Sequence, residues 1–425
     1  MNIYINPPRS DWDQLLARPS MNNQELIERV KPILAEVKAK GDAAVNEFTA
    51  RFDGVALDQL RVTESEFRAA DALVEEELKA AILQAKENIH SFHAVQWEPV
   101  QEIETMPGIT CWRKSLPIEK VGLYIPGGTA PLFSTVLMLG VPAQIAGCQE
   151  VVLCSPPNKE GNIHPAILYA AQAVGIQQVY KVGGAQAIAA MAYGTESIPQ
   201  VYKIFGPGNT YVTAAKQLVS QEGVAIDMPA GPSEVMVVAD ETAPPSFVAA
   251  DLLAQAEHGV DSQVMLVAQS ESLAQAVQTE VERQVQLLPR KEIAQAALEN
   301  SRILVTERTD DFVDIINAYA PEHLILSVEN DLALGEKIHT AGSVFLGHYT
   351  PESVGDYASG TNHTLPTHGY ARAYSGVSLD SFVKKITFQK LSKAGLENIR
   401  QTVEVMAAAE QLEAHKRAVS IRFES

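Results

Sequence analysis

Cysteine is scarce in this 425-residue sequence, which contains only Cys111, Cys148 and Cys154. An odd number of thiols without metal-type spacing gives no sign of a cysteine metal site. Cys148 and Cys154 flank or lie in an apolar run that is typical of a buried strand, where thiols are inert. This usage favours a reducing, cytoplasmic compartment.

Basic residues are also in deficit: 33 Lys and Arg stand against 52 Asp and Glu, a formal net charge of −19. A surface this acidic repels phosphate backbones and anionic lipids, so roles at nucleic acid or at a membrane surface are not expected. No apolar run is long enough to span a bilayer. The first residues, MNIYINPPRSDWDQLL, lack the basic start and apolar run of a signal peptide.

Material for a core is plentiful, because 46% of the residues are hydrophobic. A chain of this length exceeds one compact core and implies two or three domains. From about Gly108, short aliphatic runs alternate with helical stretches, which predicts parallel strands joined by crossover helices. We therefore expect an α/β fold with two open, mainly parallel, Rossmann-like sheets flanked by helices. The expected strands are 120–125, 151–154, 179–182 and 201–205 in one sheet and 235–239, 264–268, 303–306, 324–328 and 344–346 in the other.

The two ends of the chain depart from this rhythm. Residues 1–20 are expected to form a loose arm, because an early Pro-Pro pair blocks a helix. Helices follow, and Thr63-x-x-Glu66 has the form of a capping box at the start of a helical stretch reaching about residue 92. Beyond a strand-like segment at 382–388 the tail is helical. It has little core of its own, so we expect it to pack on another subunit or domain.

Three glycine-bearing turns follow expected strands, and open α/β sheets bind ligands at the carboxyl ends of their strands. The turns are GLYIPGG, VGGAQ and IFGPGN. Together they can bring backbone N–H groups and helix N-termini towards phosphates. None completes Gly-x-Gly-x-x-Gly, because Tyr211 stands at the third glycine position after Gly206 and Gly208. By pattern alone the dinucleotide signal is weak, and a tight turn explains each one equally well.

The stretch Asp251-Leu-Leu-Ala-Gln-Ala-Glu-His258-Gly259 has the pattern of an amphipathic helix end stopped by a glycine. Gln255 and His258 are three residues apart and project from one face. An amide oxygen beside an imidazole suits a divalent metal or a polar ligand. A solvated helix terminus is the plainer interpretation of the same residues.

A second candidate pair is Glu322-His323, which follows Ala320-Pro321. The proline turns the residue before it away from helical geometry, so the pair stands at the start of a strand or in its loop. An adjacent acid and imidazole at a sheet edge can act as general base and helper. A surface loop with a satisfied histidine fits the same pattern.

Polar residues elsewhere extend this set. Asp356 and His363 bracket a glycine-rich stretch and can reach a metal; with His258 they offer mixed nitrogen and oxygen ligands that suit zinc or manganese. Ser233 can hydrogen-bond a ligand or simply occupy a turn.

Glu410 and His415 add another acid and imidazole near the end of the chain. Five residues on a regular helix separate two side chains by ~140°, so by spacing alone His415 is a surface histidine.

Eight motifs in order resemble one family, histidinol dehydrogenase, from about residue 20 to the C-terminus. They are VGLYIPGGTAPLFSTVLM, VGGAQAIAA, KIFGPGN, DMPAGPSEV, LLAQAEHG, APEHL, GDYASGTNH and AAAEQLEAHK. The resemblance implies oxidation of L-histidinol to L-histidine through the aldehyde, in two NAD-dependent steps with one zinc ion per site. It also implies a homodimer in which the partner subunit contributes Glu410 and His415, which overrides the surface-histidine interpretation.

The resemblance assigns roles residue by residue. The implied zinc ligands are Gln255, His258, Asp356 and His415, and the implied acid/base residues are Glu322 and His323. The implied substrate contacts are Ser233, Gln255, His258, His323, Asp356, Glu410 and His415. The implied NAD contacts are Tyr124, Gln186 and Asn209.

The expected domain organisation follows from these assignments. Residues 1–20 form the N-terminal arm. Residues 21–122 and 233–375 form an α/β domain with the metal and catalytic residues. Residues 123–232 form the domain on the NAD side, and residues 376–425 form a dimerisation arm.

Two rival functions use the same residues. A zinc hydrolase would pair His258 and Asp356 with a water activated by Glu322. A non-catalytic binding protein would use the glycine turns to hold a phosphorylated ligand. Only the dehydrogenase produces reduced-nicotinamide absorbance with histidinol.

Overall fold

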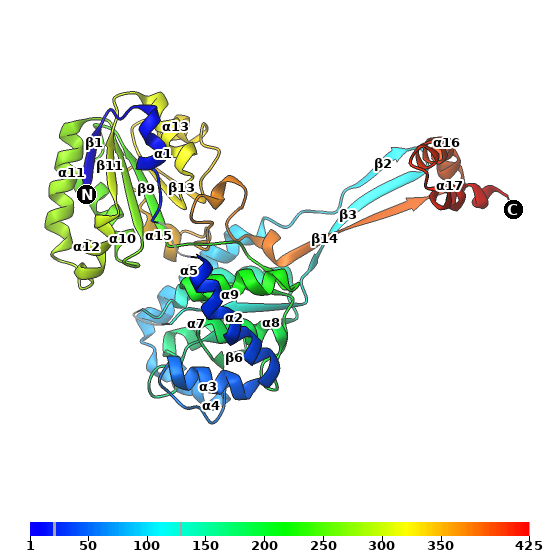
Figure 1. Cartoon of the computed structure of the whole chain (residues 1–425), viewed down its shortest axis with the longest axis horizontal. Helices are drawn as coiled ribbons and strands as arrows, with labels where there is room; N and C mark the ends of the chain where they lie inside the picture. Colours follow the sequence, from blue (N-terminus) through cyan, green and yellow to red (C-terminus); the bar gives the residue numbers. More distant parts are fainter. Residues whose placement is uncertain (20–22, 128–129, 425) are drawn as a thin grey trace.

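The computed structural model describes residues 1–19, 23–127 and 130–424. Two parallel sheets, each covered by helices, lie next to each other, and a long arm extends away from them (Figure 1). The expected α/β class with two open parallel sheets is confirmed. Within the described residues, no helix combines the length and apolarity needed to cross a bilayer.

Sheet A has six parallel strands in the order β1-β11-β10-β9-β12-β13. Helices on both faces bury its central strands completely, which is why these strands are apolar throughout. Val235 and Val237 face α10, α11 and α12, whereas Met236 and Val238 face α13 and α1. The strands are β1 (Asn2–Ile5), β9 (Glu234–Ala239), β10 (Gln263–Ala268), β11 (Arg302–Val305), β12 (His323–Ser327) and β13 (Ser343–Leu346), and the helices are α1 (Trp12–Leu15), α10 (Pro245–Ala256), α11 (Glu271–Val285), α12 (Lys291–Glu299), α13 (Thr309–Tyr319), α14 (Asp331–Gly335) and α15 (Glu352–Tyr357).

Sheet B has five parallel strands in the order β6-β5-β4-β7-β8. Numbered from its own first strand this is 3-2-1-4-5, the order of dinucleotide-binding sheets. The strand order reverses between β4 and β7, where such sheets bind their ligands. The elements are β4 (Lys120–Tyr124), β5 (Glu150–Ser155), β6 (Gln178–Lys181), β7 (Lys203–Phe205) and β8 (Ala225–Ile226), with α6 (Phe133–Ala146), α7 (Pro165–Ala173), α8 (Gly184–Tyr193) and α9 (Thr210–Gln221).

The helices before sheet B pack on sheet B, not on sheet A: α2 contacts α8 and α9, α4 contacts α7, and α5 contacts α6. The structure therefore differs from the expected grouping of residues 21–122 with 233–375. The apolar stripe of α2, including Val30 and Val37, packs into the same core as the small residues of α8. These helices are α2 (Asn23–Lys40), α3 (Asp42–Phe52), α4 (Glu64–Leu73) and α5 (Glu76–Ala94).

Two expectations for the N-terminal part of the chain differ from the structure: the loose arm, and the length of the helix that begins after Thr63. The first residues are not a loose arm, because β1 pairs in parallel with β11 at the edge of sheet A. The Thr63 capping box is confirmed, since its hydroxyl accepts from the Glu66 N–H and the Glu66 carboxylate accepts from the Thr63 N–H. The helix that it starts ends at Val74, whose extended backbone separates α4 from α5. Residues 20–21, at the expected domain boundary, lie outside the described residues.

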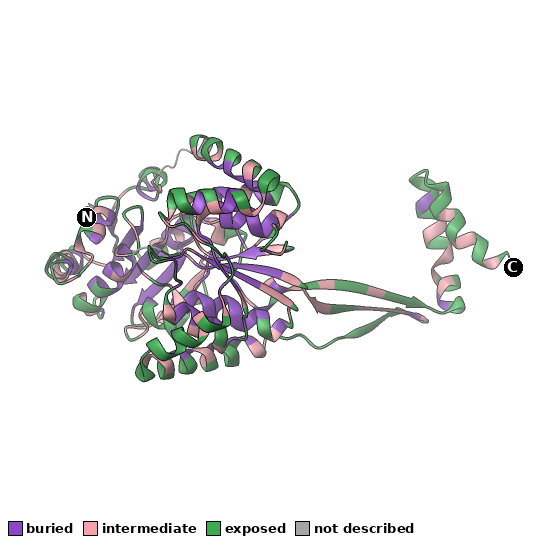
Figure 2. Cartoon of the chain, turned by 90° about the horizontal axis from the view of Figure 1, so that it is seen from below, coloured by how far each residue is buried: buried purple, intermediate pink, exposed green. Residues whose placement is uncertain are grey.

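The arm is a three-stranded antiparallel sheet, β14-β3-β2, that carries two helices at its tip (Figures 1 and 2). It is built from two distant stretches of the chain, so the expected arm of residues 376–425 contained only one of its three strands. Its surface is apolar in places: Ile103, Val405 and Met406 are 60%, 61% and 60% exposed. The arm consists of β2 (Glu102–Met106), β3 (Ile109–Pro117), β14 (Val383–Leu391), α16 (Lys393–Ala409) and α17 (Glu413–Ser420).

The tip of the arm depends on one close contact. Gly395, in the first turn of α16, faces the β2–β3 turn so tightly that a Cβ there would lie 2.1 Å from the Gly108 carbonyl oxygen. We expect Gly395→Ala to loosen the tip, so that amide hydrogen exchange over residues 393–420 accelerates about tenfold or more while both parallel sheets stay protected. Ala394→Ser, on the exposed side of the same turn, is the control. Unchanged exchange in Gly395→Ala would contradict this account of the tip.

Candidate active site

The candidate residues gather where the two sheets present opposite ends to each other. From sheet B they come from carboxyl ends: Tyr124 ends β4, Gln186 lies in the first turn of α8 after β6, and Asn209 caps α9 after β7. From sheet A they come from amino ends, because His323 begins β12 and Ser233 immediately precedes β9. The rule that ligands lie at carboxyl ends therefore describes sheet B alone.

His323 is buried within a cluster of carboxylates. Its Nδ1 lies 3.7 Å from Glu322 Oε2 and 3.6 Å from Glu352 Oε1, and its Nε2 lies 3.5 Å from Asp356 Oδ1. Neither ring nitrogen has a hydrogen-bond partner, and neither does either carboxylate oxygen of Glu352. The ligand atoms of His323, Glu352 and Asp356 lie within 4.8 Å of one another, close enough to hold a metal ion together.

The electrostatics of this cluster are dominated by burial and by its own carboxylates. Burial lowers the pKa of His323, but the charges of Glu352, Glu322 and Asp356 outweigh it and raise that pKa to about 10. Burial raises the pKa of Glu322 to about 8 and also raises the pKa of Glu352, despite the nearby imidazole. Asp251, on α10, has its pKa raised by burial to about 7. Several buried acids, one of which, Glu352, has no hydrogen-bond partner for either carboxylate oxygen, favour a bound cation.

Helix α10 brings two further candidates to the same place, because it packs against α15. Gln255 is fully buried, yet neither atom of its side-chain amide has a hydrogen-bond partner. His258 lies at the solvent-exposed end of α10. The protein atoms around its ring lower its pKa, whereas the Asp356 carboxylate raises it. His258 and Asp356 are therefore close enough to interact electrostatically.

His363 supports the site from behind. Its Nδ1 donates to the Asp356 carbonyl oxygen at 2.9 Å, and its Nε2 accepts from the Thr135 hydroxyl at 3.1 Å. A carbonyl oxygen only accepts, so Nδ1 carries a proton; burial lowers the pKa of His363, which favours the neutral tautomer with both nitrogens engaged. His363 therefore holds the chain at Asp356 and has no nitrogen left for a metal.

Arg18 fixes the segment that leads to Glu322 and His323. Its guanidinium donates to both carboxylate oxygens of Glu234, at 2.5 and 2.8 Å, and to the Tyr319 carbonyl oxygen at 2.8 Å. Ala320 adopts a left-handed backbone, with φ of 55°, which costs energy for a residue with a Cβ. Glu322 Oε2 accepts a hydrogen bond from the Glu234 N–H at 2.9 Å, so the backbone of β9 holds the Glu322 carboxylate in place.

Glu352 is the residue of this cluster that the sequence interpretation missed. It is 1% exposed and precedes Asp356 by four residues on α15, so the two share one helix face. That spacing was the available signal. A short helix after a turn-rich stretch gave no indication that the face is buried.

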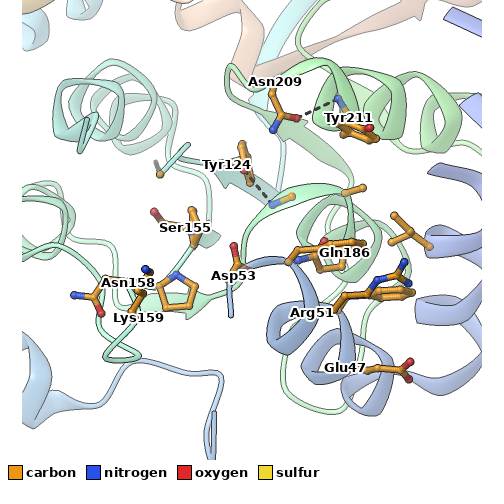
Figure 3. A pocket seen from close by; sticks show the side chains of 18 of the residues that line it. Glu47, Arg51, Asp53, Tyr124, Ser155, Asn158, Lys159, Gln186, Asn209 and Tyr211 are labelled. Atoms are coloured by element: carbon orange, nitrogen blue, oxygen red, sulfur yellow. Dashed lines mark hydrogen bonds between the residues drawn. The ribbon is translucent and has the colours of Figure 1, made fainter. Parts of the chain in front are cut away.

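Two cavities are lined by the other candidate residues. The large cleft, of about 1280 Å³, runs along the carboxyl edge of sheet B and is lined by Tyr124, Gln186 and Asn209 (Figure 3). The small cavity, of about 790 Å³, is lined by Ser233 and His258. Both share Gly127, Ala130 and Asn209, so a ligand in one can meet a ligand in the other. Residues 128 and 129 of the first glycine turn lie outside the described residues.

The assigned residues of the large cleft also support its walls. The Tyr124 hydroxyl accepts from the Gly184 N–H at 3.1 Å, which fixes the start of α8. The Asn209 side-chain oxygen accepts from two backbone N–H groups of α9, leaving its amide hydrogens free for a ligand. Gln186 is 1% exposed, and both polar atoms of its side chain lack hydrogen-bond partners.

Glu410 and His415 do not join the cluster within one chain. Glu410 ends α16 and His415 lies in α17, both exposed at the tip of the arm, far from the two sheets (Figure 1).

A 3-2-1-4-5 sheet with a cleft at its carboxyl edge, together with a buried histidine–carboxylate cluster in the same chain, defines a dinucleotide-dependent enzyme of the α/β class. The histidinol dehydrogenase family model matches residues 16–423. A histidinol dehydrogenase from Bacteroides thetaiotaomicron is 60% identical over 423 residues, covering 100% of this chain and 99% of the relative. One from Yersinia pestis is 56% identical over 427 residues, covering 99% and 96%.

A solved structure agrees with these relatives. The crystal structure of histidinol dehydrogenase from Elizabethkingia anophelis superimposes with a TM-score of 0.98 at 56% identity, covering 100% of this chain and 98% of that one. The chain belongs to the histidinol dehydrogenase family and is an NAD-dependent oxidoreductase. The resemblance of the sequence motifs to this family is confirmed.

The carboxylates around His323 give a prediction for the metal-free enzyme. Because the folded-state pKa of His323 lies above its ordinary value, its charge stabilises the fold at low pH, and this contribution is lost as the pH rises through about 10. Glu352→Gln removes one of the charges that favour the imidazolium, so the pKa of His323 should fall, as measured by NMR titration of labelled histidine. Asp251→Asn, which acts on Glu352, should move it less. A pKa unchanged by Glu352→Gln would contradict this charge balance.

Proposed function

We propose that this enzyme oxidises L-histidinol to L-histidine through the aldehyde, in two successive hydride transfers to two NAD⁺ molecules, with one zinc ion per site. The observation that carries the proposal is His323, buried among three carboxylates in a chain whose sheet B has a large cleft at its carboxyl edge. Family membership supports histidinol as the substrate.

The donor set fits a divalent metal. The unpartnered buried amide of Gln255 supplies an oxygen, Asp356 a carboxylate and His258 an imidazole, a mixture that suits zinc. We assign these three residues, with His415 of the partner subunit, as its ligands. When bound, the ion would supply a positive charge that orients the substrate and opposes the charge of the acids around His323.

The two transfers use the same histidine. In the first, His323 takes the proton of the alcohol oxygen as a hydride leaves the carbon, giving the aldehyde. Glu322 then takes a proton from water as it adds to the aldehyde. His323 takes the proton of the resulting hydrate as the second hydride leaves, giving the carboxylate. Tyr124, Gln186 and Asn209 would hold NAD⁺, which would supply the hydride acceptor for both oxidations.

Glu352 has a positioning role in this scheme. Its carboxylate is the nearest acid to His323 Nδ1, and both of its oxygens are free to accept. An Nδ1–H directed at Glu352 leaves Nε2 as the proton acceptor, on the side of Asp356 and the substrate. Ser233, Gln255, His258, His323 and Asp356 surround the substrate from one subunit.

A homodimer completes the site. The arm holds Glu410 and His415 far from its own sheets and exposes apolar side chains that a second copy of the chain would cover. We assign Glu410 and His415 of the partner subunit to the substrate and the metal. Neither nucleic acid nor a membrane is part of the proposal. The three free cysteines agree with a cytoplasmic enzyme.

Both rival functions account for less of the structure. A zinc hydrolase would use the acids near His323 and would leave the 1280 Å³ cleft of sheet B without a role. A non-catalytic binding protein would use the cleft and would not need a buried imidazole among three acids.

The role of His323 can be separated from metal binding. His323→Asn should lower kcat for histidinol oxidation by about 10²–10⁴-fold, as expected when a general base is lost. Zinc content, measured by elemental analysis, should stay at one ion per subunit. His348→Asn is the matched control, because this histidine bonds to Ser327 and Thr242 at the other edge of sheet A. Undiminished turnover in His323→Asn would place the base elsewhere.

Sharing of the site between subunits can be tested with mixed dimers. His323→Asn and His415→Ala should each be inactive alone. Refolded together, half of the dimers are mixed, and each mixed dimer has one site with both native histidines, so about a quarter of the wild-type activity should return. If one chain supplied both histidines to its own site, mixing would restore nothing.

A further inference from the structure

The large cleft contains polar atoms that Tyr124, Gln186 and Asn209 do not explain. Ser155, the last residue of β5, is 0% exposed, and its hydroxyl has no hydrogen-bond partner. Asp53 lines the same cleft, and its Oδ2 is buried without a partner. Figure 3 shows Asp53 between Ser155 and Gln186 in this view. Buried polar atoms without partners cost stability and indicate a ligand that satisfies them.

The topology of sheet B identifies the part of the ligand concerned. In dinucleotide-binding sheets, an acid near the end of the second strand binds the hydroxyls of the adenosine ribose. The second strand here is β5, and it ends in Cys154-Ser155 followed by two prolines, without an acid. A carboxylate must therefore reach this edge from another element if the ribose is bound in the same way.

Asp53 is placed to do so. It is the residue that ends α3, and its N–H donates to the Thr49 carbonyl oxygen, which fixes its backbone. Helix α3 packs against α8, whose first turn carries Gln186. The Asp53 charge acts on the Tyr124 hydroxyl at the end of β4, so its carboxylate lies close to the switch point of the sheet.

We propose that Asp53 binds the adenosine ribose of the cofactor and, together with Ser155, selects NAD⁺ over its 2′-phosphorylated form. The carboxylate accepts hydrogen bonds from the ribose hydroxyls, and the Ser155 hydroxyl donates to or accepts from the same sugar. A 2′-phosphate would bring about two further negative charges against this carboxylate and would fill the space of the hydrogen bond. This inference rests on the use of NAD⁺ in the proposed function.

The basic residues of the cleft do not favour the phosphorylated cofactor. Arg51 and Lys159 line the cleft but are exposed, and solvent and salt screen their charges. The Arg51 guanidinium lies over the Phe52 ring, 5.3 Å from its centroid. Lys40 is paired with Glu36 at 2.5 Å. Solvent and salt screen the charge of the buried Asp53 carboxylate oxygen less than they screen the charges of exposed Arg51 and Lys159.

Equilibrium binding tests this inference without relying on turnover. NAD⁺ and NADP⁺ are titrated calorimetrically into the zinc-loaded dimer without histidinol. Asp53→Asn should weaken NAD⁺ binding about tenfold, as expected for a lost charge-assisted hydrogen bond, and should narrow the preference for NAD⁺ over NADP⁺ by at least about tenfold. Asp53→Glu, which keeps the charge but moves it, should weaken NAD⁺ binding and retain the discrimination against NADP⁺.

The matched control is Glu47→Gln, which removes an equal charge from an exposed position in the same cleft and should change the preference by less than about twofold. Circular dichroism establishes that each variant folds. An unchanged preference in folded Asp53→Asn, or equal narrowing in Glu47→Gln, would overturn the inference, even if the wild type oxidises histidinol. Conversely, a wild type that binds NAD⁺ as predicted but leaves histidinol unoxidised would overturn the proposed substrate and leave the ribose assignment standing.

Discussion

The structure depends on an unbalanced charge. Three acids, Glu322, Glu352 and Asp356, lie around the buried His323 imidazole, and a fourth, Asp251, acts on Glu352. Burying charged groups costs free energy, which is why burial raises the pKa values of Glu322 and Glu352 despite the nearby imidazole. A bound cation would offset this cost. The same charge balance suits the proposed metal ion, a substrate that carries a basic amine, and the imidazole that we propose as the base.

The candidate site combines residues from both parallel sheets. Sheet B offers its carboxyl edge, with helix N-termini and a long cleft, while sheet A offers its amino edge, with β12 and β9 beginning at the carboxylate cluster. Two parallel sheets oriented in this way bring cofactor and substrate together without either sheet containing a whole site. Arg18 donates a hydrogen bond to the Tyr319 carbonyl oxygen, next to the left-handed backbone of Ala320. The N-terminal segment therefore supports the candidate site as well as sheet A.

In the proposed homodimer, the arm would extend this division of the site beyond one polypeptide. A sheet made from residues 102–117 and 383–391 has too little buried surface to be explained as an independent unit, and its tip carries Glu410 and His415 far from the two parallel sheets of its own subunit. A second subunit would account for both the exposed apolar side chains and these two exposed polar residues. The role proposed for Asp53 repeats this pattern within the chain, since a helix outside the sheet would supply the acid that β5 lacks.

The sequence by itself determined the local features. Short apolar runs predicted every strand of both parallel sheets between 120 and 346 except the two-residue β8, because burial on two faces requires continuous hydrophobic stretches. The Thr63 capping box and the family motifs were equally readable, since they depend on neighbours in sequence. Only the tertiary structure decided that 23–94 covers sheet B, that β2 and β3 join β14, and that Glu352 is buried beside His323. Each of these features depends on contacts between residues far apart in the chain. The side-chain pattern of a helix shows which of its faces is buried, but it does not show which other element covers that face.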